Sequence, residues 1–378
     1  MWTRRARRLF KSPFVLLLAM CFVSAFLLFR LQGNPVVIEY VNDGLMTSLH
    51  VQKPSYHVHT LRSAVTQKPT TQNITKAPVN KHGCESWFED SMEENLEIIK
   101  NYPRGNADQF LSNISSVPRS AQTMTSFPVI VTAANYRFYG CTQGLLKSIH
   151  EKIVPKYKKV KVIFYDMGLE DDQRAKMQKY CKCEIRTFPF DKFPSHMKRL
   201  KTYAWKPLIM KMLLAEYKWV WWMDSSVRFV TDELDSALKY SLDHSHLFFT
   251  YDFILSVAEQ TDILTFTYLQ EDPCKFRHFG EIEATFLLFY SNRLTDIIID
   301  QWATCALNEA CIAPPGTHRK LSCSVFNKSI GRCHRFDQSV IGILLRRLYH
   351  ETNDYPLVDK PFHIHEIRRG EFVDYFPE

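Results

Sequence analysis

The residues of this chain that could do chemistry are carboxylates, hydroxyls and imidazoles near the ends of expected strands. Asp224 directly follows the unbroken apolar run 219–223, and Ser226 lies two positions further on. Such a run is typical of an inner strand that is covered on both faces. A carboxylate at the carboxyl end of an inner strand lies where open α/β sheets bind their ligands. A lone acid at this place is also a common turn former or helix cap, so both interpretations stay open.

Further acids and imidazoles lie in the second half of the chain. Glu281 and Glu283 have the alternate spacing that would put both carboxylates on one face of an extended segment, and His363 and His365 share that spacing. Asp337 opens an apolar run and could simply cap a helix. Solvated edges explain the two pairs equally well, so spacing alone does not establish a site.

The elements that must position these residues alternate between strands and helices. A helix with Leu208, Met212 and Ala215 on its apolar face precedes the run 219–223, and Pro207 lies in its first turn, where its missing N–H is harmless. The sequence also predicts strands at 127–133, 160–165, 184–188, 246–251 and 285–290, and helices at 87–100, 144–153, 171–180, 294–308 and 340–348. Alternation at this spacing indicates a mostly parallel sheet with right-handed crossovers. The ends of the first strands, at Asn135 and Asp166, then lie on the same edge as Asp224.

The segments YAWKP at 203–207 and WMDSSVRF at 222–229 carry a resemblance to a known fold. The arrangement resembles glycosyltransferases of the GT-A fold, in which a hydrophobic strand ends in an Asp-x-Asp motif that holds a divalent cation and a nucleotide-sugar diphosphate. It looks closer still to an animal family, abundant in nematodes, that is described only as a domain of unknown function. The resemblance covers roughly Phe127 to the C-terminus. It implies an α/β, GT-A-like (Rossmann-like) domain with a mostly parallel sheet and flanking helices.

The resemblance also implies a metal site. Asp224 would hold a divalent cation, expected to be Mn²⁺, together with Ser226. A late imidazole, from His363 or His365, would complete the site, since neutral imidazole suits manganese. This sequence departs from the motif because Ser226 replaces the second acid, and one carboxylate with a hydroxyl holds a hard cation less well than two carboxylates.

Other roles follow from the same resemblance. Ala134 and Asn135 would line the nucleotide pocket, although ordinary turn chemistry explains them nearly as well. Lys206 or Arg228 would help to offset the charge that develops on the departing diphosphate. The candidate catalytic carboxylates are Asp337, which ranks first, Glu281 and Glu283.

Several function classes are excluded by what the sequence lacks. It contains no Gly-x-Gly-x-x-Gly and no Walker P-loop, and glycine is scarce at 12 of 378 residues. The chain therefore does not read as a dehydrogenase, a kinase or a P-loop sulfotransferase. The net charge of +8 falls to +3 without five N-terminal cations, and no basic stripe with interleaved aromatics indicates nucleic-acid binding.

The N-terminal segment reads as a membrane anchor. Residues 12–29 are uncharged and follow a cluster of cations, Arg4, Arg5, Arg7, Arg8 and Lys11. The positive-inside rule places this cluster in the cytoplasm and the rest of the chain in the lumen. A cleaved signal peptide is the alternative, but residues 26–31 lack the small residues of a cleavage site. We expect a cytoplasmic tail at 1–12, a single transmembrane signal anchor at 13–31, a luminal stem at 32–83 and a luminal domain at 84–378.

Cysteines and glycosylation sequons fit an oxidising compartment. Nine of the ten cysteines follow Cys21, so most should pair, and one would stay free or join two chains in an oligomer. The dense group at 305, 311, 323 and 333 favours bridges among its own members. Sequons occur at 73, 113 and 327.

Together these features predict a Golgi type II glycosyltransferase that transfers a sugar from a nucleotide-sugar donor to a glycan or glycoprotein acceptor. The alternative is a catalytically inactive luminal binding module that retains the fold, which Ser226 keeps open. The sequence does not decide the donor sugar, the linkage or the stereochemical course.

Overall fold

The computed structural model describes residues 83–112, 114, 118–319, 323, 329–350, 357–358 and 362–377. They belong to one compact unit, 77–378. The predicted tail, the anchor and all but the last residue of the predicted stem lie outside the described residues, as do the three sequon asparagines. Within the described part of the chain, no helix has both the length and the apolar character needed to cross a bilayer.

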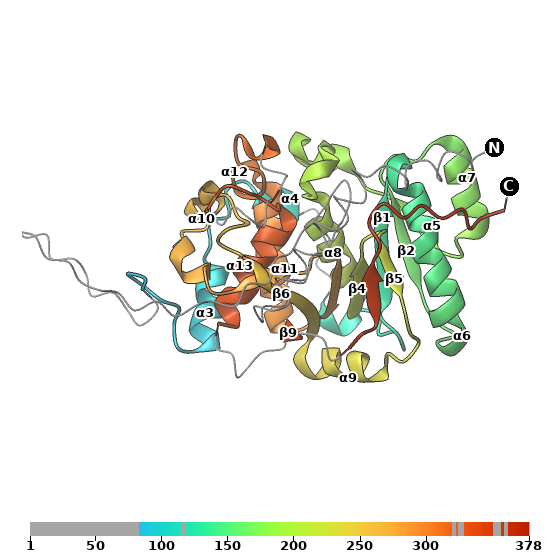
Figure 1. Ribbon diagram of the computed structural model, residues 1–378, viewed down its shortest axis with the longest axis horizontal. Coiled ribbons are helices and arrows are strands. Elements are labelled where there is room, and N and C mark those ends of the chain that lie inside the picture. The colour runs from blue at the N-terminus through green and yellow to red at the C-terminus, as the bar shows by residue number, and fades with distance from the viewer. Residues whose placement is uncertain are drawn as a thin grey trace, which may run out of the picture. The chain divides into compact units, whose positions relative to one another are not determined.

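A twisted sheet with strand order β3-β2-β1-β4-β8-β6-β7 forms the centre of the molecule, and β9 pairs with β6 (Figure 1). Its strands are β1 Val129–Ala134, β2 Val162–Asp166, β3 Glu184–Thr187, β4 Trp219–Met223, β6 His246–Ser256, β7 Gly280–Ile282, β8 Phe286–Tyr290 and β9 Leu357–Val358. The pairings β1–β2, β1–β4, β2–β3 and β6–β9 are parallel. The pairings β4–β8, β6–β8 and β6–β7 are antiparallel. The predicted α/β fold with a mostly parallel sheet is confirmed, and the antiparallel part begins on the far side of β4.

Helices cover both faces of this sheet (Figure 1). They are α3 Met92–Lys100, α4 Asp108–Leu111, α5 Tyr139–Ser148, α6 Val154–Lys156, α7 Asp171–Tyr180, α8 Trp205–Glu216, α9 Asp235–His244, α10 Ile263–Tyr268, α11 Arg293–Leu307, α12 Glu309–Ile312 and α13 Asp337–Leu348. A π-helical turn, Ile149–Ile153, joins α5 to α6. The predicted helix 171–180 and the predicted strand 219–223 have the observed bounds, whereas α5 begins five residues before the predicted Gly144.

The run 219–223 is uninterrupted because β4 contributes to two cores. Trp221 packs in the cluster that contains Leu145 of α5, and Trp222 packs in the cluster that contains Leu208 of α8 and Val340 of α13. Both tryptophans are fully buried. Alternate side chains of an inner strand point to opposite faces, so neither face of β4 could be polar.

A small second sheet closes over the end of β4. β5 Val227–Phe229 pairs antiparallel with β10 His365–Ile367, with Glu366 opposite Arg228. The Arg368 N–H also donates to the Ser226 carbonyl at 2.8 Å. The C-terminal segment, which carries the two late histidines, is therefore fastened beside the turn that follows Asp224.

Four disulfides join cysteines of the described chain: Cys84–Cys274, Cys181–Cys183, Cys305–Cys311 and Cys323–Cys333. The dense C-terminal group pairs within itself, as its spacing indicated. Among the described cysteines, Cys141 is the free one, and it is buried. Its position gives no support to the predicted bridge between chains through an unpaired cysteine.

Candidate functional site

Asp224 begins a tight turn at the carboxyl end of β4. Its N–H donates to the Thr285 carbonyl at 2.8 Å, and its carbonyl accepts from the Val227 N–H at 2.9 Å. The side chain points to the same face as Trp222, whose indole Nε1 donates to Asp224 Oδ1 at 2.7 Å. About a quarter of this side chain, 26%, stays exposed. The end of the buried strand thus presents a carboxylate that is oriented by the protein and still open to solvent.

Lys206, in the first turn of α8, is the charge partner of Asp224. Its Nζ lies 3.2 Å from Asp224 Oδ1 and 2.7 Å from Asp337 Oδ2, and it donates to the Ala284 carbonyl at 3.1 Å. The side chain is 2% exposed. Burial alone would lower the pKa of Lys206, but the two carboxylates raise it above its usual value, so the ammonium stays charged. The rings of Tyr203 and Trp222 lie 5.4 and 5.2 Å from the ammonium and stabilise it further.

Asp337 is the first residue of α13 and comes to this cluster from more than a hundred residues further along the chain. Its own carbonyl accepts a hydrogen bond from Trp302 Nε1 at 2.9 Å, which fixes the start of the helix. Burial, reinforced by the charge of Asp224 and opposed by Lys206, raises the pKa of Asp337 to about 6. The carboxylate is directed at Lys206, whereas the predicted alternative was a helix cap.

Glu281 lies next to Asp337 on the adjoining strand β7. Its Oε2 accepts a hydrogen bond from Gln338 Nε2 at 2.6 Å, and its buried Oε1 has no hydrogen-bond partner among the described residues. Burial raises the pKa of Glu281 to about 8, assisted by Asp337 and opposed by Arg335 and Gln338. Near neutral pH this group is therefore mostly a protonated acid, which makes it a poor general base there.

Glu283 belongs to a different arrangement. Its Oε1 accepts from Thr285 Oγ1 at 2.5 Å and lies 2.9 Å from His365 Nε2. β7 ends at Ile282, so the alternation that predicted a common face for Glu281 and Glu283 stops between them. One carboxylate bonds to α13 and the other to β10.

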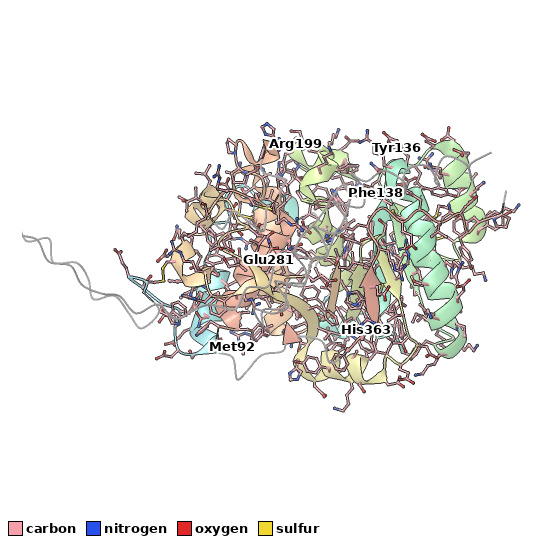
Figure 2. The ribbon with its side chains drawn as sticks, viewed as in Figure 1. Met92, Tyr136, Phe138, Arg199, Glu281 and His363 are labelled. Carbon is pink, nitrogen blue, oxygen red and sulfur yellow. A yellow bond between two sulfur atoms is a disulfide. The ribbon has the colours of Figure 1, made fainter. Side chains whose placement is uncertain are left out.

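The two late histidines differ in their surroundings. The His365 ring stacks on Phe286 with 3.9 Å between ring centroids and an interplanar angle of 3°. His363 precedes β10 and is exposed. Figure 2 labels His363 and Glu281, which lie well apart in that view.

The described residues do not fit a divalent cation at this site. Asp224 Oδ1 already accepts an indole N–H and contacts the Lys206 ammonium. The second acidic position of the motif is Ser226, and the Nε2 of His365 is held by Glu283. No group of three or more His, Cys, Asp or Glu side chains in the described part of the chain is arranged to hold a metal ion.

The predicted nucleotide-binding residues lie on the expected edge of the sheet. Ala134 ends β1, and its register opposite Asp166 of β2 aligns the two strand ends. Asn135 caps the 3₁₀ turn 136–138 by accepting from the Arg137 N–H at 3.2 Å. Exposed aromatic side chains, Tyr136 and Phe138, project from this turn (Figure 2).

Arg228 is directed away from Lys206. Its Nη1 donates to the carbonyls of Ser225 and Val227 at 2.8 and 2.9 Å, and its Nε lies 3.5 Å from Glu371 Oε1. Its guanidinium also covers Gly144 of α5, where an added Cβ would lie 2.2 Å from Nη2. The pairing of β5 with β10 explains this direction, because it fixes which face of β5 each side chain takes.

A cavity of about 230 Å³ opens over the Lys206 cluster. Its lining comprises Tyr203, Lys206, Asp224, Ala284, Thr285, His334, Arg335, Phe336, Asp337, Gln338 and Arg369. The sequence predicted Lys206, Asp224 and Asp337 as site residues, whereas Arg335 and Arg369 were not predicted. Arg335 lies two positions before Asp337 and could have been found with it, whereas no local pattern distinguishes Arg369 from its neighbour Arg368.

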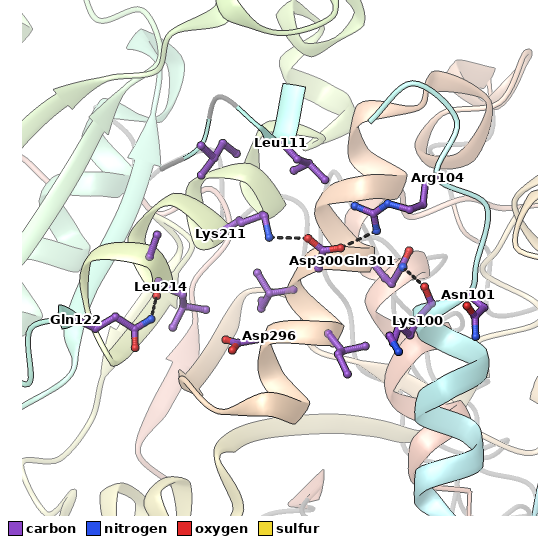
Figure 3. Close-up of a pocket in the computed structure, with 14 residues that line it drawn as sticks. Lys100, Asn101, Arg104, Leu111, Gln122, Lys211, Leu214, Asp296, Asp300 and Gln301 are labelled. Atoms are coloured by element: carbon purple, nitrogen blue, oxygen red, sulfur yellow. Dashed lines mark hydrogen bonds and ion pairs between the residues drawn. The ribbon is translucent and has the colours of Figure 1, made fainter. Parts of the chain in front are cut away.

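A larger cavity, about 680 Å³, lies between α3, α8 and α11 (Figure 3). Its charged residues are largely paired with one another: Asp300 lies 2.6 Å from Lys211 Nζ and 2.7 Å from Arg104 Nη1. None of the residues that line it is a predicted site residue, and none lies at the carboxyl end of a strand. We therefore assign the candidate site to the smaller cavity, where charge is concentrated and the strand end contributes a residue.

One family model matches part of this chain. Residues 76–211 match the model of a family described as "Protein of unknown function (DUF1647)", a match that includes Lys206 and ends before Asp224. This span differs from the expected resemblance, which began near Phe127 and ran to the C-terminus. No curated protein matches the sequence.

Solved structures of low sequence identity are also similar to this chain. The bifunctional glycosyltransferase WbbM is 11% identical, with 60% of this chain and 39% of that chain covered and a TM-score of 0.35. Core-mannan synthase A from Aspergillus fumigatus, in an Mn/GDP form, is 10% identical, with 61% and 73% covered and a TM-score of 0.36. Mouse xyloside xylosyltransferase 1 is 10% identical, with 59% and 83% covered and a TM-score of 0.35. The chain thus spans well under half the length of the first of these proteins.

Proposed function

We propose that this protein is a glycosyltransferase that moves a sugar from a nucleotide-sugar donor to a glycan or glycoprotein acceptor. One observation carries the proposal: a buried ammonium, Lys206, lies between the carboxylates of Asp224 and Asp337 beneath a polar cavity at the carboxyl edge of β4. The carboxyl edge of such a sheet is where α/β proteins bind ligands, and the cavity combines cations with potential proton acceptors.

The chemistry of glycosyl transfer needs both kinds of group. When the bond between the sugar carbon and the diphosphate oxygen breaks, the electron pair goes to the diphosphate. Cations that are fixed beside the leaving oxygen stabilise this developing charge. The acceptor hydroxyl oxygen forms the new bond, and its proton must pass to a base.

Asp337 suits the role of that base better than the other acids of the cluster. Its pKa of about 6 leaves it mostly ionised near neutral pH and basic enough to accept a proton in the transition state. Glu281, with a pKa of about 8, is mostly protonated under the same conditions. Asp224, partly exposed and anchored by Trp222, is placed to accept hydrogen bonds from sugar hydroxyls.

The cellular setting is part of the same proposal. The cation cluster and uncharged segment of residues 4–29 support a type II anchor, and a luminal catalytic domain in the Golgi would follow from it. The disulfides of the described chain are consistent with an oxidising compartment, where such bonds form and persist.

A binding module without catalysis is the second candidate. Ser226 favours it, because the hydroxyl removes the second acid of the Asp-x-Asp motif. Such a module would bind a nucleotide sugar or glycan in the same cavity and release no nucleotide.

The test is nucleotide release by the full-length chain from a panel of nucleotide sugars, with and without acceptor glycans. We expect release from one donor, and we expect Asp224→Asn to reduce it by roughly 10²-fold, the size typical of one lost charged contact. Asp243→Asn is the matched control, because Asp243 is a half-exposed aspartate of α9 whose ion pair within the described residues is with the exposed Lys239. Donor binding without release from any donor would favour the binding module, and neither binding nor release would refute both.

A further inference from the structure

Two arginines on the cavity wall have guanidinium groups that contact no other side chain of the described residues through a hydrogen bond or ion pair. Arg335 lies just before α13 and Arg369 lies in the turn after β10, and both line the cavity. Within the described residues, neither guanidinium makes a hydrogen bond or an ion pair with another side chain. The contrast with Arg368 is direct, since that neighbour pairs with Glu366 at 2.7 Å and with Glu371 at 3.3 Å.

The charges around the cavity compensate these two guanidinium groups only in part. Asp224 and Asp337 are both engaged by Lys206. Lys206 neutralises only one of these two carboxylates, and the two arginines bring the net charge of the wall to +1. The planar guanidinium fork binds phosphate oxygens through paired hydrogen bonds, so two such groups from different segments suit a ligand with two adjacent phosphates.

The size of the cavity narrows the ligand further. Sites that enclose a whole drug-sized ligand usually measure about 300–1,000 Å³. This cavity, at about 230 Å³, is smaller. It can enclose the diphosphate and part of the sugar, while the nucleoside would lie outside it, towards the loop at Asn135.

The side chains at this site are poor ligands for a divalent cation. A lysine ammonium lies against Asp224 Oδ1, Ser226 replaces the second acid, and Glu283 holds the Nε2 of His365. Yet the departing diphosphate still needs positive charge. We propose that Arg335 and Arg369 bind the donor diphosphate directly, with Lys206 beneath them, and that donor binding is therefore independent of divalent metal. This inference rests on the proposed function, which it extends to the mode of donor recognition.

The experiment measures binding of UDP, GDP and inorganic pyrophosphate to the full-length chain by titration calorimetry, once in EDTA and once in Mn²⁺. We expect at least one of these probes to bind with an affinity that EDTA changes by no more than about twofold. Arg335→Gln and Arg369→Gln should each weaken that binding by about tenfold or more, because hydrogen bonds between ionised groups are roughly twice as strong as those between neutral groups.

Two controls separate binding from folding. Arg277→Gln removes an exposed arginine that does not line the cavity, and it should leave the affinity unchanged. Thermal unfolding of the two cavity variants should match that of the parent chain, because neither guanidinium forms an ion pair with the part of the chain that the structure describes. Arg335→Lys keeps the charge without the fork and should recover only part of the affinity.

Binding that appears only with Mn²⁺ overturns the inference, and so does the failure of every probe to bind in either buffer. Unchanged affinity in both glutamine variants overturns it as well. Nucleotide release from the donor panel separates this result from the larger proposal. If nucleotide release requires Mn²⁺, the proposed glycosyltransferase activity stands and the proposed metal-independent donor binding is refuted. Binding in EDTA that both variants weaken, with no release from any donor, keeps the diphosphate site and refutes the transfer.

Discussion

Two buried clusters of charge lie at opposite ends of α13, and they are built from the same ingredients. At its first residue, Asp337 pairs with Lys206 beside the rings of Tyr203 and Trp222. In its last turn, Arg347 pairs with Glu271 over the ring of Phe88, 5.3 Å away.

The two clusters differ in how many of their charged groups lack a partner within the described residues. Glu271 accepts from both Arg347 and Tyr102, and Arg347 Nη1 also donates to Asn95 Oδ1 at 2.9 Å. The side chains of Glu271 and Arg347 are 0% and 4% exposed. The Lys206 cluster instead opens on a cavity, where Asp224 is partly exposed and two guanidinium groups have no partner within the described residues. A buried ion pair alone therefore does not indicate a ligand-binding site. Charged side chains that face a cavity without a partner do.

The largest loss of stability should come from breaking the Glu271–Arg347 cluster, called the closed cluster here because it opens on no cavity. Glu271→Ala would leave the Arg347 guanidinium buried without its carboxylate, and we expect a loss of about 3–5 kcal/mol in the free energy of unfolding. Chemical denaturation measures this change. Glu309→Ala removes the exposed partner of Arg199 and should alter stability by less than about 1 kcal/mol. Equal losses in the two variants would show that the closed cluster is not structural.

Breaking the Lys206 cluster, the open cluster that faces the cavity, should affect nucleotide release more than stability. Lys206→Met should reduce nucleotide release by roughly 10²–10³-fold, because it removes the cation fixed beneath the leaving group. Its loss of stability should stay near 1–3 kcal/mol, since Asp224 is reached by water and Asp337 can take up a proton. Lys211→Met, on the same helix and paired with Asp300, is the control that should retain release. A Lys206→Met variant with full release would remove the distinction between the clusters.

The pH dependence of stability should sharpen the comparison. The pKa of Glu281 rises from 4.5 to about 8 on folding, so the folded state holds this proton more tightly than the unfolded state does. The stabilisation from the bound proton is complete below about pH 4.5 and is lost as the pH rises towards 8.

Glu281→Gln should therefore be stabilised relative to the parent chain by on the order of a few kcal/mol more at pH 9 than at pH 5. Denaturation at the two pH values tests this difference. Stability curves that run parallel from pH 5 to 9 would mean that burial of the Glu281 carboxyl does not shift its titration.

The smallest effect should come from the residue that orients Asp224. Trp222→Phe keeps an aromatic ring in the core but removes the N–H that donates to Asp224 Oδ1. We expect donor affinity to fall about fivefold to tenfold, in line with roughly 1 kcal/mol for one hydrogen bond. Trp219→Phe, which removes a donor to Ser241 on the other side of β4, is the control. Equal binding by both variants would show that Asp224 needs no fixed orientation.

Much of the framework could be predicted from local pattern. The apolar run of β4 identified an inner strand because both of its faces must exclude water, and the helix with Pro207 in its first turn matched α8. The edge shared by Asn135, Asp166 and Asp224 followed from parallel pairing, which aligns strand ends.

The partners of each site residue could not be predicted in this way. Lys206 and Arg228 looked equivalent as helpers of a diphosphate, yet α8 brings the first to Asp224 while β5 turns the second towards Gly144. His365 was predicted as a metal ligand, but its Nε2 contacts Glu283 and its ring stacks on Phe286.

By itself the sequence determined the strand that delivers Asp224, the helix that carries Lys206 and the residue types available for charge stabilisation. Only the tertiary structure decided that Asp337 meets Lys206, that Arg335 and Arg369 share one cavity, and that a lysine lies where a metal was expected. The physical reason is that periodicity reports burial along a few neighbouring residues. A contact between segments more than a hundred residues apart depends on how whole helices and strands pack.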